Sequence, residues 1–133
     1  MIAGVADTHS ALWYLFGDPR LSAPAKSAFD AAALSRRKIA LSAISLAEVV
    51  YLVEKGRLLA SAYIDLQNAL HDPDHVLQEA PVTSEIVDSM MGVPRADIPD
   101  MPDRIVAATA TYFGVPAISR DGRIRASSVQ SIW

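Results

Sequence analysis

Short apolar segments alternate along this chain with longer segments in which apolar residues recur at helical spacing, and this alternation predicts an α/β protein. Strands joined by helices need crossover connections, so we expect a mostly parallel sheet with helices on both faces. The chain has 133 residues, 51% of them hydrophobic, and it contains no internal repeat, low-complexity tract or linker. We therefore expect a single domain that spans residues 1–133 and buries its own core.

The first half of the chain predicts two strands and four helices. Residues 2–6 and 39–42 are short apolar runs, which are typical of buried strands. Serine is a favoured N-cap, and glycine commonly ends a helix. On these signals we expect helices from residue 8 to the Gly17-Asp18-Pro19 turn, from a Ser22 N-cap towards Arg36-Arg37-Lys38, from a Ser45 N-cap to Gly56, and over about 60–71.

The second half predicts three more strands and two helices. We expect the strands over residues 76–82, 115–119 and 128–133. A short helix should follow a Thr83 N-cap, and a loop with two prolines should follow it. A longer helix should begin at Asp100-Met101-Pro102-Asp103, since proline is tolerated in a first turn and aspartate favours that end, and it should stop at Gly114.

Composition excludes several classes of site. The chain has no cysteine, so it has no disulfide, no thiolate nucleophile and no cysteine-based zinc site. The N-terminal apolar run is too short for a signal peptide or a membrane span, and we expect a cytoplasmic protein with no membrane partner. The net charge of −3 argues at first against a nucleic-acid partner. A cluster of metal-binding acids would give that sign by itself, and the basic residues are grouped, at 36–38 and at Arg120, Arg123 and Arg125.

Two aspartates follow predicted strands, at the sheet edge where ligands of parallel α/β proteins bind. Asp7 directly follows the first strand, and Asp121 follows the fourth strand by two residues. Each could simply cap the next helix, which is a common role for aspartate after a strand. That alternative is weaker for Asp7, because Thr8 behind it could cap equally well.

Glu48 lies inside an otherwise apolar helical segment, at the edge of the stripe that should be buried. A carboxylate at such a position suggests a functional group. The alternative is a capping box, in which Ser45 at the N-cap and Glu48 three residues later each bond the backbone of the other. The local pattern favours neither interpretation.

Acids are also concentrated in one short stretch, at Asp97, Asp100 and Asp103. Asp100 as N-cap with Asp103 in the first turn would satisfy backbone amides, and Arg95 or Arg104 could pair with them. Three acids are nonetheless more than a helix start needs, and like charges this close repel unless a cation shares the site. Hard divalent cations such as Mg²⁺ bind carboxylate oxygens of this kind and can activate water against a phosphodiester.

Other catalytic motifs are absent. The chain has no glycine-rich phosphate loop, Ser–His–Asp arrangement or HExxH zinc motif. His9, His71 and His75 are scattered, and His9 near Asp7 either contacts substrate or is merely exposed. Trp13 and Tyr14 are expected to pack in the core or between helices.

Four blocks of the sequence, in order and at the expected intervals, resemble PIN domains, and in particular VapC-type toxins of bacterial and archaeal toxin–antitoxin pairs. The first block has Asp-Thr-His followed by Leu-Trp, and the second a serine-rich turn and a helix ending in Glu. The third has Asp-Met-Pro-Asp-Arg where the family has Asp-Pro-Phe-Asp-Arg, and the fourth has a Ser two residues before Asp. The blocks cover residues 7–13, 42–49, 100–110 and 119–124.

The resemblance implies a PIN-like fold with strand order 3-2-1-4-5, in which strands one and four are neighbours. It implies an acidic quartet of catalytic and metal-binding residues, which are Asp7, Glu48, Asp103 and Asp121. The quartet would bind Mg²⁺ or Mn²⁺, with Asp100 as a candidate fifth ligand. Ser119 should orient an acid or a metal-bound water, and Thr8 and Arg104 are candidates for positioning substrate. The displaced proline is a departure from the family pattern beside Asp100, and it leaves Asp103 and Arg104 in register.

From the acids and the resemblance together we expect a metal-dependent endoribonuclease that cleaves cellular RNA. Arg104, Arg120 and Arg123 are candidate phosphate contacts, or else solvated or acid-paired side chains. One alternative is a catalytically silent PIN scaffold that binds RNA or protein, which an intact quartet argues against. Another, a phospho-accepting receiver domain, fails because it needs an acid pair after strand one and a late lysine, whereas the lysines here are Lys26, Lys38 and Lys55.

The third and fourth predicted helices carry more bulky apolar groups than one helical stripe readily buries. These groups are Tyr51, Leu52, Leu58, Leu59, Tyr63 and Leu66. Apolar surface of this kind commonly marks a protein interface, although the two helices could also pack only on each other. The resemblance implies a small antitoxin protein that wraps this region and inserts a basic side chain among the acids, and it implies a homodimer.

Overall fold

The structure, a computed structural model, describes residues 1–133 and contains one five-stranded sheet in which every pairing is parallel. The strand order is β3-β2-β1-β4-β5, so β1 lies in the middle, between β2 and β4. The predicted α/β class and the strand order that the resemblance implied are both confirmed. The strands are β1 (Ile2–Ala6), β2 (Lys38–Ser42), β3 (Leu77–Ala80), β4 (Ala117–Ile118) and β5 (Ser131–Ile132).

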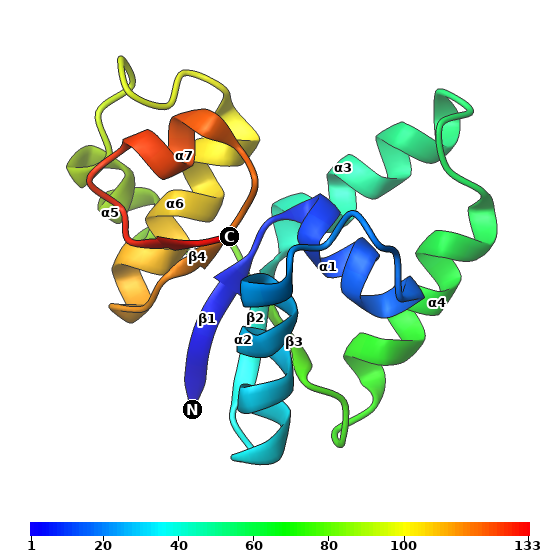
Figure 1. The fold of residues 1–133 in the computed structure, drawn as a ribbon. Coiled ribbons are helices and arrows are strands. Elements are labelled where there is room, and N and C mark those ends of the chain that lie inside the picture. The colour runs from blue at the N-terminus through cyan, green and yellow to red at the C-terminus, as the bar shows by residue number, and fades with distance from the viewer.

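Helices cover both faces of the sheet, with α1 to α4 on one side of β1 and α5 to α7 on the other (Figure 1). The first layer consists of α1 (Thr8–Phe16), α2 (Ala23–Leu34), α3 (Ala43–Glu54) and α4 (Ala60–His71). The second consists of α5 (Ser84–Ser89), the 3-10 turn η1 (Met90–Gly92), α6 (Met101–Phe113) and α7 (Gly122–Ala126). None of these helices is both long enough and apolar enough to span a membrane.

Successive side chains of a strand point to opposite faces, and this alternation divides the core into two clusters. In β2, Ile39 and Leu41 pack with Phe29 of α2 and Leu66 of α4, whereas Ala40 packs in the cluster under α6. Both faces of the sheet are thus buried, which is why the central strands are apolar throughout. A sheet that is packed on both faces holds the loops at the ends of its strands in place.

The outer strands are shorter than the sequence predicts. β3 ends at Ala80, directly before Pro81, whose nitrogen has no hydrogen to donate to a ladder. β4 pairs only at Ala117 and Ile118, and β5 pairs only opposite these two residues. The strands predicted over 115–119 and 128–133 therefore pair over only two residues each.

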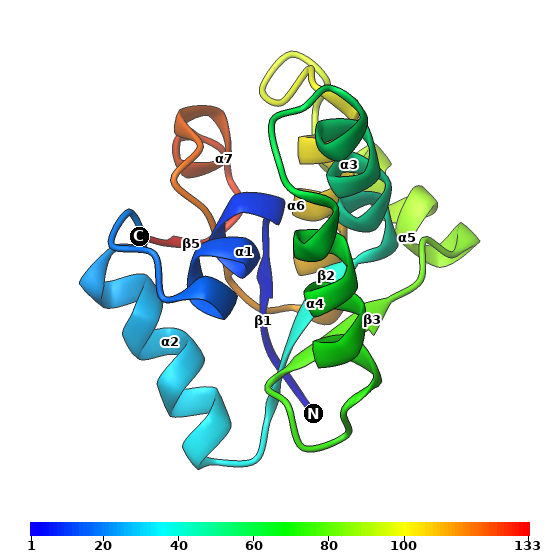
Figure 2. The same ribbon diagram turned by 90° about the vertical axis from the view of Figure 1, so that its right-hand side faces the viewer.

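Helices α1, α3 and α7 all begin where β1, β2 and β4 end, at the same edge of the sheet, and β1 rises towards this edge from the N-terminus (Figure 2). The prediction of Ser45 as the N-cap of α3 is wrong. Because β2 runs directly into the helix, its last residue, Ser42, caps it, and the Ser42 hydroxyl accepts a hydrogen bond of 3.2 Å from the Ile44 amide. The short helix α7, capped by Asp121, was not expected from the sequence.

Candidate active site

Five carboxylates line one cavity of about 390 Å³ at the edge where β1, β2 and β4 end. They come from four separate parts of the chain, and His9, Trp13 and Arg120 complete the lining. The five are Asp7, Glu48, Asp100, Asp103 and Asp121. The fold thus brings together every acid that the sequence assigned to the site.

Asp7 is held from two directions. As the N-cap of α1 it accepts a hydrogen bond of 2.9 Å from the Ser10 amide through Oδ1. Its other oxygen, Oδ2, accepts a hydrogen bond of 2.5 Å from the hydroxyl of Ser119, which follows β4. The parallel register pairs Ala6 with Ile118, so the residues that follow them meet side by side. Asp7 therefore caps a helix and lines the acidic cavity at the same time.

Glu48 is positioned by a threonine and takes no part in a cap. The Thr8 hydroxyl donates a hydrogen bond of 2.6 Å to Oε1 of Glu48, joining the start of α1 to the middle of α3. The capping-box alternative is excluded, because Ser42 caps α3 and the buried hydroxyl of Ser45 has no hydrogen-bond partner. The carboxylate of Glu48 is thus turned into the cavity.

Asp100 and Asp103 combine a cap with the acidic cavity. Asp100 is the N-cap of α6, and its Oδ2 accepts a hydrogen bond of 3.1 Å from the amide of Asp103. The pKa of Asp103 is raised to about 7, first by burial and then by the negative charges of Asp121, Asp100, Glu48 and Asp7. Burial and the charges of the other four acids therefore both favour the protonated form of Asp103.

Asp121 is fixed by backbone amides and connected to Asp7 through one serine. Its Oδ1 accepts hydrogen bonds from the amides of Arg123 and Ile124, at 2.9 and 3.0 Å. Its own amide donates to the Ser119 hydroxyl oxygen at 3.0 Å, and that hydroxyl donates in turn to Asp7. Ser119 is fully buried, so its hydroxyl holds the loop after β4 in a fixed position against the end of β1.

The donor set suits a hard divalent cation. None of the five carboxylates forms an ion pair with an arginine or lysine, since the ion pairs of the chain are Asp18–Arg20 and Lys26–Asp30. Uncompensated carboxylate oxygens around one cavity are the ligands that Mg²⁺ and Mn²⁺ prefer. No three acidic or histidine side chains lie close enough together to form a ready-made ligand group, so a bound cation would have to draw these side chains inward.

The arginines named from the sequence lie in three different places. Arg104 does not face the acids: its guanidinium donates hydrogen bonds of 2.8 Å to the carbonyls of Val93 and Met90, so the expectation of a substrate or acid contact is corrected to a structural role. Arg123 is exposed beside a separate hollow near Asp97. Arg120 lines the acidic cavity.

Trp13 has a second role besides the core packing that the sequence predicts. It is buried among the helices of the first layer, yet its ring also lines the acidic cavity. The guanidinium carbons of Arg20 and Arg120 lie 5.1 and 4.7 Å from the ring centroid. Arg20 was not predicted as a site residue, and no signal in the sequence distinguishes it from the other exposed arginines.

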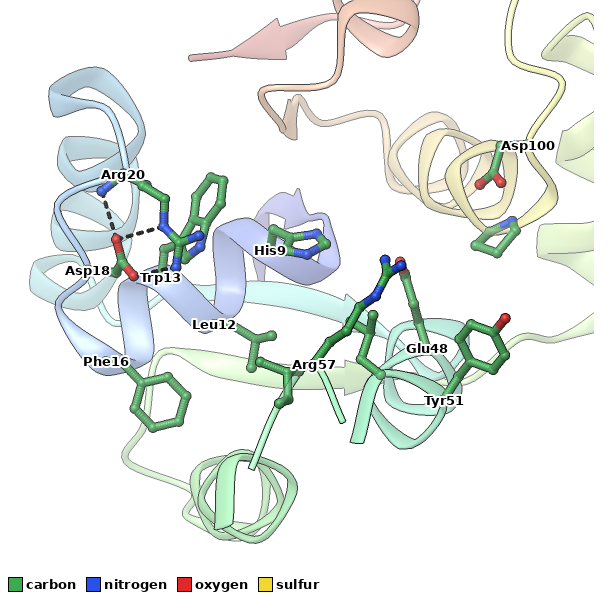
Figure 3. Close-up of a pocket in the computed structure, with 13 residues that line it drawn as sticks. His9, Leu12, Trp13, Phe16, Asp18, Arg20, Glu48, Tyr51, Arg57 and Asp100 are labelled. Carbon is green, nitrogen blue, oxygen red and sulfur yellow. Dashed lines mark hydrogen bonds and ion pairs between the residues drawn. The ribbon is translucent and has the colours of Figure 1, made fainter. Parts of the chain in front are cut away.

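A second cavity of about 550 Å³ continues from the first between α1 and the end of α3 (Figure 3). The two share His9, Trp13, Glu48 and Asp100. We call the second cavity the trough. Arg57, from the loop after α3, extends into it and was not predicted either (Figure 3).

The apolar surface predicted on α3 and α4 is present but differs in detail. Leu66 is fully buried against the sheet and does not belong to it, while Leu52, Leu58 and Tyr63 are half-buried between the helices. Tyr51 and Leu59 are exposed, as predicted. A separate apolar groove lies between the two helices and is lined by Val50, Val53, Glu54, Ala60, Tyr63 and Ile64.

Comparison with known proteins establishes the family. The model of the PIN domain family matches residues 5–128, so the chain belongs to the PIN domain family. A curated relative, ribonuclease VapC22 of Mycobacterium tuberculosis (strain ATCC 25618 / H37Rv), is 26% identical over 125 residues, which cover 94% of this chain and 92% of the relative. The family resemblance noted in the sequence is therefore confirmed.

Solved structures support the same fold. The structure of VapBC2 from Rickettsia felis, bound to a DNA fragment from its promoter, matches with a TM-score of 0.71 at 17% identity over 98% of this chain and 97% of the other. FitAcB from Neisseria gonorrhoeae matches with a TM-score of 0.61 at 21% identity over 98% and 96%. A toxin–antitoxin complex from Klebsiella pneumoniae has the same TM-score at 20% identity over 93% and 92%.

Proposed function

We propose that this protein is a divalent-metal-dependent endoribonuclease and the toxin of a toxin–antitoxin pair. The observation that carries the proposal is the set of five carboxylates around one cavity with no basic side chain paired to any of them. Such a site is electrostatically incomplete without a cation, as the raised pKa of Asp103 indicates. Membership of the PIN family and the similarity to a relative named as a ribonuclease support the reaction class.

We assign the metal ligands to Asp7, Asp103 and Asp121, with Asp100 as a further candidate. These are hard oxygen donors on four fixed backbone positions, each at or beside a helix N-terminus. Mg²⁺ or Mn²⁺ bound there would neutralise the carboxylates and polarise the phosphodiester. Ser119 positions Asp7 through its hydroxyl, which donates to Oδ2.

Glu48 is our candidate for the general base. Its Oε1 is occupied by the hydrogen bond from Thr8, which leaves Oε2 to accept a proton from a water in the cavity. Thr8 is buried and fixes the side chain of Glu48 without facing substrate itself, so we assign it a positioning role. Arg120, on the rim of the same cavity, is the candidate contact to the phosphate of the substrate.

The proposal includes partners and a cellular compartment. The apolar groove between α3 and α4 would bind an antitoxin, as the solved toxin–antitoxin relatives suggest, and we propose that the isolated protein is a homodimer. An enzyme that acts on cellular RNA would work in the cytoplasm.

The decisive experiment is cleavage of total RNA by the purified protein in Mg²⁺ or Mn²⁺, repeated with EDTA and with Asp7→Asn. We expect new RNA ends only when the wild-type protein is incubated with the metal, and none with EDTA or with Asp7→Asn. Cleavage that persists in EDTA would contradict metal dependence. RNA binding without cleavage, under all metal conditions, would instead favour a catalytically silent PIN scaffold.

A further inference from the structure

Arg120 is the one arginine that lines the acidic cavity, and it forms an ion pair with none of the five carboxylates there. A guanidinium beside uncompensated acids would ordinarily form short, charge-assisted hydrogen bonds with them. The backbone around Arg120 is fixed, since Ser119 is fully buried and its hydroxyl accepts a hydrogen bond of 3.0 Å from the amide of Asp121. The position of the Arg120 side chain therefore depends on a further group that holds it away from the acids.

That group is the indole ring of Trp13. The guanidinium carbon of Arg120 lies 4.7 Å from the centroid of this ring, within the range of a cation–π contact. Tryptophan binds cations more strongly than the other aromatic side chains do. Because Trp13 lines the acidic cavity too, the contact keeps the Arg120 guanidinium on the rim of this cavity.

The Trp13 ring is itself fixed in place. It is only 6% exposed and belongs to the core cluster of the first helical layer. The ring centroids of His9 and of Trp133, which follows β5, lie 5.7 and 5.9 Å from that of Trp13, and both pairs are tilted. A ring that is packed on several sides cannot turn to follow a mobile side chain, so it sets the position of a cation that rests on it.

Arg20 also contacts Trp13, but its charge is already compensated. Its guanidinium carbon lies 5.1 Å from the ring centroid, and its Nη2 lies 2.7 Å from a carboxylate oxygen of Asp18 (Figure 3). Two uncompensated cations on one ring would repel each other. The ion pair with Asp18 removes this repulsion, so the ring can hold Arg120 as its single uncompensated cation.

We propose that Trp13 is a positioning residue for Arg120. Its ring holds the guanidinium on the rim of the acidic cavity, so that the carboxylates stay free for a divalent cation and the guanidinium stays free for a phosphate. Once released from the ring, Arg120 would compete with the cation for the same carboxylates. The inference rests on the proposed function, which supplies the cation and the phosphate, and it adds a role for Trp13 that acts through Arg120.

The test is a double-mutant cycle on Trp13 and Arg120, with Mn²⁺ affinity measured by isothermal titration calorimetry in the absence of RNA. Trp13→Leu should weaken Mn²⁺ binding about three- to tenfold, the range expected for the loss of one cation–π contact. Arg120→Ala should not weaken it. In the Arg120→Ala background, Trp13→Leu should have no further effect, because the competing guanidinium is gone.

Two further variants serve as controls. Arg125→Ala removes a positive charge from the same segment, but Arg125 is exposed and does not line the acidic cavity. In this background Trp13→Leu should weaken Mn²⁺ binding as much as it does in the wild type. Trp13→Phe keeps an aromatic ring in the core and decides the test if the leucine variant does not fold. It should give a smaller loss of affinity, which Arg120→Ala again removes.

A loss of Mn²⁺ affinity that persists in the Arg120→Ala background would show that Trp13 acts through packing alone, and it would overturn the proposal. Unchanged affinity in Trp13→Leu would overturn it as well, and so would a wild-type protein that binds no Mn²⁺.

Cleavage of RNA by the wild type separates this inference from the nuclease function. If the cycle gives the expected coupling but the wild type cuts nothing with any metal, the positioning role stands and the nuclease function falls. If the wild type cuts in a metal-dependent way and Trp13 and Arg120 show no coupling in Mn²⁺ affinity, the nuclease function stands and the positioning role falls.

Discussion

Thr8 and Glu48 are 40 positions apart in the sequence, and the Thr8 hydroxyl donates a hydrogen bond of 2.6 Å to Oε1 of Glu48. The bond joins two helices that begin at neighbouring strand ends, α1 after β1 and α3 after β2. Because Thr8 is buried, few other rotamers are open to its side chain, and the hydroxyl keeps the carboxylate of Glu48 directed into the acidic cavity.

Removing that hydrogen bond should reduce activity without removing an acid. We expect Thr8→Val to lower kcat about 10- to 100-fold, as is typical when a group that orients a metal or catalytic residue is lost. Glu48→Gln should lower kcat further while leaving the thermal midpoint nearly unchanged, since Glu48 caps no helix. The measurements are steady-state cleavage of a labelled RNA and thermal unfolding. A Glu48→Gln protein with full activity would remove Glu48 from the mechanism.

Asp7→Asn should abolish cleavage and leave the fold intact. Asparagine is also a good N-cap, so the hydrogen bond to the Ser10 amide is retained, and one charge is removed from a set that repels itself. Circular dichroism and cleavage at saturating Mg²⁺ test the two parts. Near-full activity of this variant would contradict the metal site.

Asp103→Asn should stabilise the metal-free protein, and more so at high pH. The pKa of Asp103 is raised to about 7 in the folded chain, above its ordinary value of 3.8. Between these values the folded chain keeps a proton that the unfolded chain has lost, so stability falls as pH rises and the loss is complete above about pH 7. Because the side chain is only half-buried, we expect a gain on the order of 1–2 kcal/mol at pH 8 after allowance for solvent screening.

The measurement is urea unfolding in EDTA at pH 5 and pH 8, with Asp97→Asn as control. Asp97 is exposed and does not line the acidic cavity. A gain for Asp103→Asn that is equal at both pH values, or that is matched by the control, would show that Asp103 does not experience the repulsion described above.

Mg²⁺ or Mn²⁺ should raise the Tm, because a ligand that binds only the folded chain stabilises it by mass action. Ca²⁺ should also bind yet support little cleavage, since it is larger and less strict in its geometry. The Asp7→Asn/Asp103→Asn double variant should show no metal-dependent shift. A shift equal to that of the wild type would locate metal binding elsewhere.

The isolated protein should be a dimer at about tens of micromolar in light scattering, and it should be inhibited by a small protein encoded beside it. Ile64→Asp should prevent binding of that inhibitor, because it places a charge in the apolar groove between α3 and α4. Val87→Asp on α5, a site of similar exposure on the other layer, is the control. A stable monomer with no inhibition would contradict both partner proposals.

The fold class, the central strands and the identity of the acids could all be predicted from the sequence. Apolar runs of strand length that alternate with helical spacing leave few arrangements other than a parallel sheet between helices, and Asp7 and Asp121 follow strands that must end at one edge. These patterns involve residues that are close together in the sequence, so they can be recognised without a structure. The four blocks that resemble PIN domains added the strand order, which periodicity alone does not contain.

The contacts of each polar group, in contrast, could not be predicted before the fold was known. Glu48 faces the cavity because it accepts a hydrogen bond from the hydroxyl of Thr8, 40 residues away. Arg104 has a structural role because its guanidinium donates to the carbonyls of Val93 and Met90. Arg20 and Arg120 meet on Trp13 because β4 lies beside β1, an arrangement that no local spacing encodes. Hydrogen bonds and ring contacts act over a few ångströms, so their partners are known only once distant segments have been brought together.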